Sequence, residues 1–355
     1  MLLVTTWFGT FLLEDHAVVE KRLFPQEPAA LAARLAEVED WKVLNEEREL
    51  LAKAEEVFVV EPRLERAGGK FTAERPPFLD AEDFGYSRAL LHAAMVELAK
   101  RQIRKAVGTE DHLRQAVEAL DDLQDQENLL LERLREWYGL HFPELARTVD
   151  AETYLELIAT HGQRQAMPID HRDSVGADLG EAEEQEIRET ARLAQAVGER
   201  RAGIEAYVER TIRGLAPNTA ELAGPVLAAR LVSLAGSLEA LARAPAGTIQ
   251  VLGAERALFR HLRTGARPPK HGVLFQHPIV HQAPPWQRGA IARLLASKIA
   301  MAARADAYTH RTIRDTLKED LERGLRQIRQ KKREKPLRRT AKGGKQTRHR
   351  RRETF

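Results

Sequence analysis

The chain has 355 residues, of which 31% are charged and 43% hydrophobic, and its formal net charge is +3. This is the composition of a folded, helix-rich protein of two or three domains. Cysteine is absent, which excludes disulfide bonds and thiolate metal sites, and no apolar run reaches the roughly 18 residues of a membrane span. The apolar start carries no basic segment, so we expect no signal peptide.

The first 85 residues are predicted to form a small α/β domain. Two β-prone runs, 4–13 and 17–24, are separated by Glu14, Asp15 and His16, and this pattern predicts a β-hairpin. The other elements expected in this domain are helices at 28–38 and 45–53, a short strand at 57–60 and a linker at 70–83.

Residues 86–215 are predicted to form a long helical arm. A first helix is expected at 86–107, and Thr109 then caps a second helix whose first turn is acidic. The second helix repeats its seam positions at alternating spacings of four and three, which is a heptad pattern. These positions are Leu113, Val117, Leu120, Gln124, Glu127, Leu131, Leu134 and Tyr138. The two polar members lower stability but can fix the register of the pairing.

A return helix is predicted at 181–212, antiparallel to the first. Its apolar positions keep helical spacing, and they are Ile187, Leu193, Val197, Ile204, Val208 and Ile212. The exposed faces of such a coiled coil suit self-association with a second copy. A closed hairpin without a partner is the alternative interpretation.

The turn between the two long helices is rich in aromatic residues. Trp137, Tyr138 and Phe142 are predicted to pack the tip of the arm rather than to form a binding site, because large rings are the usual anchors of a core. Residues 163–180 are expected to be an irregular bridge.

The segment 252–308 concentrates positive charge on apolar helices. Helices are expected at 254–263 and 286–308, with a proline- and glycine-containing loop between them. Nine lysine or arginine residues fall in this window against two acids, Glu255 and Asp306. The pattern favours a folded surface that faces phosphates, although a solvated helical face would show the same charge.

The last residues, 331–355, form a basic tail. They contain twelve Lys or Arg and two Glu, a net charge of +10 that leaves −7 for the rest of the chain. The scarcity of apolar residues predicts disorder, and the charge indicates a polyanionic partner. A nuclear address signal would have the same composition.

Three strings give the C-terminal segment a family resemblance: GAERALFRHLRTG, PPKHGVLFQHPIVHQAPPWQRG and IARLLASKIAMAARADAY. They resemble the Nop domain of the scaffold proteins of box C/D guide-RNA particles and of a related spliceosomal protein. The string NLLLERLREWYGLHFPEL at 128–145 is similar to the tip of the family's helical arm, and FGTFLLEDHAVVEKRLFP resembles its N-terminal domain more loosely. Where the family usually has a lysine after the Gly-Ala-Glu string, this chain has Arg256.

The resemblance implies a mainly α fold. Its parts would be a fibrillarin-binding α/β domain (1–85), a self-associating coiled-coil arm (86–215), an all-α Nop domain (216–330) and a disordered basic tail (331–355). It implies a scaffold, most directly an archaeal one, for RNA-guided ribose 2′-O-methylation of rRNA or tRNA. The partners implied are a box C/D guide RNA, its kink-turn-binding protein, the methyltransferase fibrillarin and a second copy. The place of action would be the archaeal cytoplasm, or the nucleolus in a eukaryote.

The resemblance also suggests which residues make contacts. The kink-turn-binding protein would contact Gly253, Ala254, Glu255 and Arg256. The candidate RNA-binding residues are Arg260, Lys270, His271, Gln276, His277, Arg293, Lys298 and Arg304. The cations among them would meet phosphates, whereas Gln276 and His277 would approach bases or sugars.

No arrangement of catalytic residues is evident. Gly68, Gly69 and Lys70 lack the upstream glycine of a phosphate-binding loop, and Pro278 separates His277 from His281 in a way that disfavours a helical metal site. We therefore expect no catalysis, cofactor or metal. Two alternatives to the guide-RNA scaffold remain open. One is a spliceosomal Nop-domain scaffold on a small nuclear RNA, and the other is a coiled-coil adaptor that binds only proteins.

Overall fold

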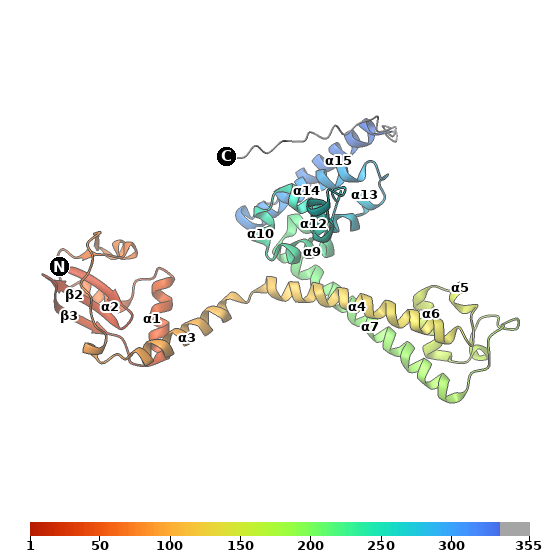
Figure 1. The fold of residues 1–355 in the computed structure, drawn as a ribbon, viewed down its shortest axis with the longest axis horizontal. Coiled ribbons are helices and arrows are strands. Elements are labelled where there is room, and N and C mark those ends of the chain that lie inside the picture. The colour runs from red at the N-terminus through yellow and green to blue at the C-terminus, as the bar shows by residue number, and fades with distance from the viewer. Residues whose placement is uncertain (334–355) are drawn as a thin grey trace, which may run out of the picture. The chain divides into compact units, whose positions relative to one another are not determined.

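The computed structural model describes residues 1–333, and the chain divides into two compact units, Met1–Gly108 and Thr109–Phe355 (Figure 1). Among residues 1–333, helices predominate and strands occur only in the first unit, which confirms the predicted mainly α fold with a small N-terminal α/β domain. The predicted basic tail lies outside the described residues from residue 334 onward, and Lys331 is the last residue of the final helix.

The first unit is built on a five-stranded sheet of order β3-β2-β1-β4-β5. β2 pairs antiparallel with β1 on one side and with β3 on the other. β4 pairs parallel with β1, and β5 pairs parallel with β4. Asp15 and His16 turn between β2 and β3 with φ angles of 49° and 67°, which confirms the predicted hairpin. The strands are β1 (Leu2–Thr6), β2 (Gly9–Glu14), β3 (Ala17–Leu23), β4 (Phe58–Val59) and β5 (Lys70–Phe71).

The run 4–13, predicted as one continuous β segment, breaks at Trp7 and Phe8. The hydroxyl of Thr6 donates to the carbonyl of Gly9 at 2.9 Å and closes this turn. Phe8 is 2% exposed, so the turn is held by burial of an aromatic ring. Its central residues carry none of the glycine, asparagine or aspartate signals that mark a tight hairpin turn in a sequence, and the prediction therefore missed it.

Three α-helices and two short 3₁₀ turns complete the first unit. α3 packs against α1 through the buried side chains of Ala94 and Leu98, and Arg101 donates to the carbonyl of Ala29 at 3.0 Å. The first unit thus extends to Gly108, whereas the sequence placed its boundary at residue 85. The helices are α1 (Pro28–Glu39), α2 (Asn45–Leu51) and α3 (Arg88–Ala106), with η1 (Pro62–Ala67) and η2 (Glu82–Phe84).

The second unit begins with the arm, in which α4 (Thr109–Tyr138) and α7 (Glu181–Leu215) lie antiparallel (Figure 1). Leu113 near the start of α4 shares a core with Ile212 near the end of α7. Leu134 near the end of α4 belongs to a second core at the tip. The tip elements are α5 (Leu145–Thr148), α6 (Ala151–His161) and the 3₁₀ turn η3 (Arg164–Ala166).

The predicted seam of the arm is buried at both ends of α4 but not in its middle. Gln124 is exposed, and Glu127 accepts a hydrogen bond from Nε of Arg201 on α7 at 2.6 Å. On α7 the seam position predicted at Leu193 is wrong, because that side chain is 55% exposed and Ala191 is buried instead. A small residue lets the two helices approach closely, which an apolar-spacing rule does not detect.

The C-terminal domain is built around α14, whose Ile291, Leu295 and Ile299 are fully buried. α8, α10, α11 and α15 pack against this helix. The elements are α8 (Pro217–Ala223), α9 (Pro225–Ala235), α10 (Leu238–Arg243), α11 (Ala246–Val251), α12 (Glu255–Thr264), η4 (Val273–Gln276), α13 (Pro278–His281), α14 (Arg288–Arg304), the π turn η5 (Ala305–Thr309) and α15 (Arg314–Lys331).

Three short helices, α8, α9 and α10, follow the arm in direct succession. Gly224 and Gly236 separate them with φ angles of 83° and 92°, which only glycine adopts readily. The middle piece, α9, packs against both helices of the arm, and its Arg230 forms an ion pair with Asp121 of α4. The base of the arm and the C-terminal domain therefore share one core.

A buried carboxylate joins three helices of this domain. Asp306 is 2% exposed and accepts hydrogen bonds from the backbone amides of Asn218 and Thr219 at 3.1 and 2.8 Å, and from both their side chains. The side-chain carbonyl of Asn218 in turn accepts from the amides of Ile313 and Arg314 at 2.8 and 3.0 Å. The start of α8, the π turn η5 that follows α14 and the start of α15 are thereby fixed to one another.

Candidate nucleic-acid interface

The segment between Gly253 and Gly272 leaves the C-terminal domain and returns to the same point; we call it the α12 lobe. The amide of Gly272 donates to the carbonyl of Gln250 at 2.9 Å, and that of Val273 donates to the carbonyl of Leu252 at 2.8 Å. A Cβ on Gly253, where φ is +80°, would lie 2.5 Å from the side chain of Val273. One on Gly272 would lie 1.8 Å from the carbonyl oxygen of Leu252, so both glycines are required by the neck of the lobe.

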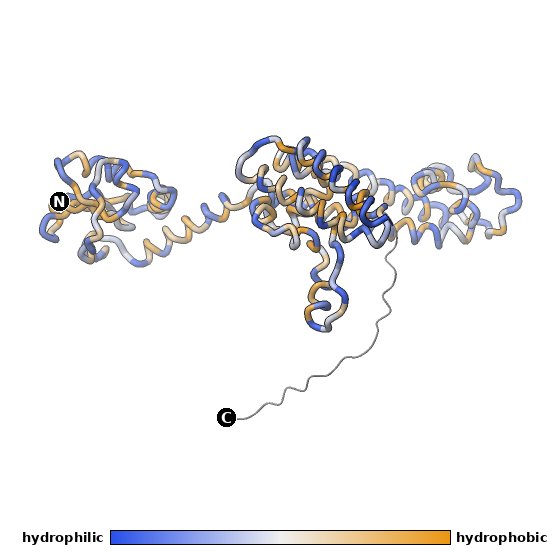
Figure 2. The backbone as a smooth tube through the Cα atoms, turned by 90° about the horizontal axis from the view of Figure 1, so that it is seen from above, coloured by the Kyte–Doolittle hydropathy of each residue, from blue (hydrophilic) through white to orange (hydrophobic). Residues whose placement is uncertain are grey.

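Helix α12 buries none of its side chains although it is strongly amphipathic. Phe259 and Leu262 are 62% and 69% exposed, and the guanidinium groups of Arg256, Arg260 and Arg263 are exposed on the same helix. The helix lies in front of the domain in Figure 1, and the view from above shows a helical segment projecting from the body (Figure 2). An exposed helix that carries cations and large apolar side chains suits a composite surface of RNA and protein.

The residues predicted to meet the kink-turn-binding protein lie at the entrance to this lobe. Glu255 accepts a hydrogen bond from the amide of Gly253 at 2.7 Å and so closes the first turn of its own helix. Ala254 is half-buried, whereas Arg256 is exposed. Glu255 is exposed as well, but its carboxylate is engaged by the amide of Gly253, so Arg256 is the exposed cation of this set.

Two predicted RNA-binding residues are engaged in the fold instead. Nζ of Lys298 lies 2.8 Å from a carboxylate oxygen of Asp320 on α15, and its side chain is only 15% exposed. Nδ1 of His277 accepts from the amide of Ile279 at 3.2 Å, and its Nε2 lies 3.2 Å from the carbonyl of Leu222. Burial lowers the pKa of His277, so the ring is neutral and caps α13. The geometry favours structural roles for both residues.

Three other predicted cations keep exposed side chains; Lys270 and Arg293 lie at the neck of the lobe, whereas Arg304 lies at the opposite end of α14. Arg293 contacts the side-chain oxygen of Gln250 with Nε at 3.4 Å, and Arg304 donates from Nε to the carbonyl of Ala242 at 3.0 Å. Lys270 is exposed at the end of the lobe. Each of these groups retains donors that can reach a phosphate.

The polar and aromatic candidates lie on η4 and just before it. Gln276 is exposed and accepts from Nη1 of Arg230 at 2.8 Å, which links this surface through Asp121 to the arm. His271 is half-buried, with its ring stacked on that of Phe275. The family resemblance suggested His271 as a candidate, whereas sequence reasoning did not single out Phe275, which only its aromatic character could have signalled.

The aromatic turn at the tip of the arm is a packing feature, as predicted. Tyr138 and Phe142 are buried in the tip core, and Trp137 is half-buried against it. The hydroxyl of Tyr138 donates to the carbonyl of Gly162 at 2.6 Å, and burial raises the pKa of this phenol.

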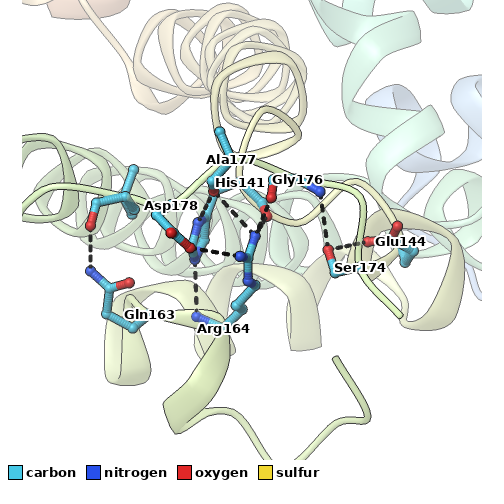
Figure 3. Close-up of polar contacts among 9 residues, drawn as sticks. His141, Glu144, Gln163, Arg164, Ser174, Gly176, Ala177 and Asp178 are labelled. Carbon is cyan, nitrogen blue, oxygen red and sulfur yellow. Dashed lines mark hydrogen bonds and ion pairs between the residues drawn. The ribbon is translucent and has the colours of Figure 1, made fainter. Parts of the chain in front are cut away.

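A guanidinium group holds the irregular bridge of residues 163–180 against the tip (Figure 3). Nη1 of Arg164 donates to the carbonyls of His141, Gly176 and Ala177 at 2.7, 2.6 and 3.1 Å, and its Nη2 contacts a carboxylate oxygen of Asp178 at 2.8 Å. The amide of Arg164 also donates to Nε2 of His141 at 3.1 Å. The bridge is therefore an ordered strap in which Arg164 makes the most contacts, and Glu144 holds it further through the hydroxyl of Ser174 and the amide of Val175.

Replacing Arg164 with alanine is expected to loosen this strap without unfolding the arm. Losing hydrogen bonds from a charged donor costs about 2 kcal/mol, which corresponds to roughly 30-fold faster amide exchange in the loop. Hydrogen exchange of residues 174–180 measures the effect. Arg172→Ala is the matched control, since Arg172 is exposed and pairs only with the neighbouring Asp170. Equal exchange in the two variants would contradict the assignment.

The first unit exposes apolar side chains that a protein partner could cover. Phe58 and Phe71 lie on the paired strands β4 and β5 and are 40% and 48% exposed, and Phe78 is 89% exposed. Val19 on the opposite edge strand, β3, is 54% exposed. Both edges of the sheet thus offer candidates, and the sequence did not single out any of them.

Within residues 1–333 we find no group of three or more His, Asp or Glu side chains arranged to hold a metal ion. None of the helices in this range is both long and apolar enough to cross a bilayer.

The described parts define a class: a helical protein with an arm, a separate α/β unit and a projecting cationic helix. A family model described as "Nop: snoRNA binding domain, fibrillarin" matches residues 119–327. An uncharacterized NOP5 family protein of Methanocaldococcus jannaschii is 37% identical over 370 aligned positions, which cover 93% of this chain and 87% of that protein. The chain belongs to the Nop family, as the sequence resemblance predicted.

Two further similarities are more limited. Nucleolar protein 58 of Candida glabrata is 39% identical over 211 residues, which cover 54% of this chain but only 41% of that larger protein. A solved structure of a fibrillarin/Nop5p complex matches 92% of this chain and all of the matched chain, with 22% identity and a TM-score of 0.41.

Proposed function

We propose that this chain is the non-catalytic core scaffold of an RNA-guided ribose 2′-O-methylation particle. It bridges a box C/D guide RNA, together with a kink-turn-binding protein, to a fibrillarin-type methyltransferase. Rate enhancement comes from holding the methyltransferase near the target nucleotide, because proximity alone can supply a large effective concentration. The particle acts on rRNA or tRNA, in the cytoplasm of an archaeal cell or in the nucleolus of a eukaryotic one.

The observation that carries this proposal is the projecting α12 lobe in a chain of the Nop family. A lobe without buried side chains contributes little to the stability of its own domain. Its arginines and exposed apolar residues can instead contact RNA and protein at the same time. Among the relatives, an archaeal NOP5 family protein aligns along nearly the whole chain, which favours the guide-RNA scaffold over the spliceosomal and protein-only alternatives.

The structure refines which residues we propose for each contact. Arg256 contacts the kink-turn-binding protein, and Gly253, Ala254 and Glu255 form the adjoining backbone surface at the start of α12. Arg260, Lys270, Arg293 and Arg304 meet phosphates, and Gln276 and His271 approach the nucleotides. Lys298 and His277 support this surface from within, since their polar atoms are already paired.

The arm is proposed to join two copies of the chain. Leu129 on α4 and Leu193 on α7 are 62% and 55% exposed, which is unusual for leucines on helices that already pair with each other. Coverage by a second copy would bury them. In the first unit, the exposed edges of the sheet are proposed to hold the methyltransferase.

Reconstitution tests the proposed function directly. Guide RNA, kink-turn-binding protein, methyltransferase and a complementary target are combined with or without this chain, and methyl transfer is measured. We expect transfer only in the complete mixture, and none from this chain without the methyltransferase. Transfer at the same rate when this chain is omitted would contradict the scaffold role, and transfer by the chain alone would contradict its non-catalytic character.

A further inference from the structure

Four side chains with flat or delocalised groups gather beside the neck of the α12 lobe. The rings of His271 and Phe275 are stacked, with centroids 4.6 Å apart and planes 12° apart. The ring of His281 approaches that of Phe275 edge-on, with centroids 5.0 Å apart, and the guanidinium carbon of Arg288 lies 5.1 Å from the centre of the Phe275 ring. These contacts unite the end of the lobe, η4, α13 and the start of α14.

The arrangement is rigid before any ligand binds. Nε of Arg288 donates to the carbonyl of Ala283 at 2.9 Å, and its Nη2 donates to the carbonyl of His281 at 3.0 Å. Phe275 is half-buried and packs against the main core of the domain. The ring of His271 stays partly exposed although Phe275 covers one of its faces, and the ring of His281 is exposed as well. Stacking surfaces of this kind cost little ordering entropy when a flat ligand binds.

The charge state of His271 distinguishes it from the cations around it. Partial burial, and then the neighbouring Arg288 and Lys270, lower the pKa of its imidazole below the usual value of 6.5. The ring is therefore neutral at neutral pH and is suited to stacking rather than to pairing with phosphate. Metal binding is disfavoured at the same place, because the nearby side chains are cationic and no acidic residue completes a ligand set within residues 1–333.

We propose that His271 and Phe275, held by Arg288, form a stacking platform for one unpaired nucleobase of the bound RNA, with Lys270 at the adjoining phosphate. This inference rests on the proposed function, because it requires that the chain bind guide RNA. Unpaired bases are recognised by stacking on aromatic side chains and guanidinium planes, and every base offers a flat face. The platform thereby orients the RNA at the neck while the arginines of α12 hold its backbone.

The test uses the full chain with the kink-turn-binding protein and a box C/D guide RNA. 2-Aminopurine replaces each unpaired purine beside the kink-turn, one at a time, and fluorescence quenching reports stacking. We expect quenching at one position with the native chain and with His271→Phe, which keeps a flat ring, but not with His271→Ala. Since alanine substitution of a base-stacking side chain costs ~1–3 kcal/mol, His271→Ala should weaken affinity on the order of tenfold.

Two controls separate stacking from charge and from folding. His271→Ala should leave the salt dependence of binding unchanged, because a neutral ring displaces no counterion, whereas Arg260→Ala on α12 should reduce it. Removing the base at the quenched position should lower the affinity for the RNA as much as His271→Ala does. Combining the two changes should lower the affinity no further than either change alone.

The outcomes are distinguishable. If the native chain fails to bind guide RNA, both the proposed function and the stacking platform are refuted. If the native chain binds, but His271→Ala binds equally well or loses affinity equally for RNA with and without the base, only the platform is refuted. A His271→Phe variant that folds but fails to restore quenching would also refute it.

Discussion

Replacing Arg256, Arg260 and Arg263 together with alanine is expected to abolish stable assembly on guide RNA while leaving the fold intact. Each arginine that neutralises a phosphate contributes about 0.9 to the slope of log affinity against log salt. Arg256 is assigned to the kink-turn-binding protein, so Arg260 and Arg263 account for up to about two units of slope, and the affinity of the triple variant at moderate salt should fall by about 100-fold. Filter binding over a salt series measures both quantities.

The fold is expected to tolerate this change because α12 buries no side chain. Exposed substitutions of this kind usually alter the free energy of unfolding by less than about 0.5 kcal/mol. The matched control is the triple alanine variant of Arg200, Arg210 and Arg213, exposed residues of α7 with the same total charge. Equal loss of RNA binding in the two triple variants would show that net charge, and not the lobe, determines binding.

Asp306→Ala is expected to destabilise the C-terminal domain by at least about 3 kcal/mol. The substitution leaves the amides and side chains of Asn218 and Thr219 buried without their acceptor, and each such group costs ~1–3 kcal/mol. Because Asn218 also caps α15, the loss should spread to that helix. Denaturant unfolding followed by hydrogen exchange in α8 and α15 measures the effect.

Two further variants test the mechanism of this destabilisation. Asp306→Asn keeps one acceptor oxygen and should lose less stability than Asp306→Ala. Asp315→Ala, at an exposed acid in the first turn of α15, should change stability by less than about 0.5 kcal/mol. A loss below about 1 kcal/mol for Asp306→Ala would mean that water replaces the carboxylate, and the buried network would then not fix the three helices.

The elements that the sequence predicted well are those whose signals are local. Thr109, predicted to cap the second helix, is the first residue of α4, whose first turn is acidic as expected, and Pro28 begins α1. The side-chain roles that the sequence did not predict depend on partners distant in the chain. Lys298 forms an ion pair with Asp320, and His277 contacts the carbonyl of Leu222. Both partners lie far away in the sequence, so the residues next to Lys298 and His277 do not predict these contacts.

The same distinction explains the candidate interface. The positive charge of the segment 252–308 and its family strings located the surface, because both are properties of contiguous sequence. Which of its side chains remain exposed depends on packing across α11, α14 and α15. The stacking of His271 on Phe275 likewise arises from a turn that brings residues four apart face to face.

The central claim is that the C-terminal domain recognises RNA and the kink-turn-binding protein together. A gel shift with a box C/D guide RNA, with and without the kink-turn-binding protein, tests it most directly. The account predicts a stable complex only when both are present, and none with a scrambled kink-turn. Equal binding to any RNA without the second protein would contradict a composite surface and would point to non-specific attraction by the basic residues.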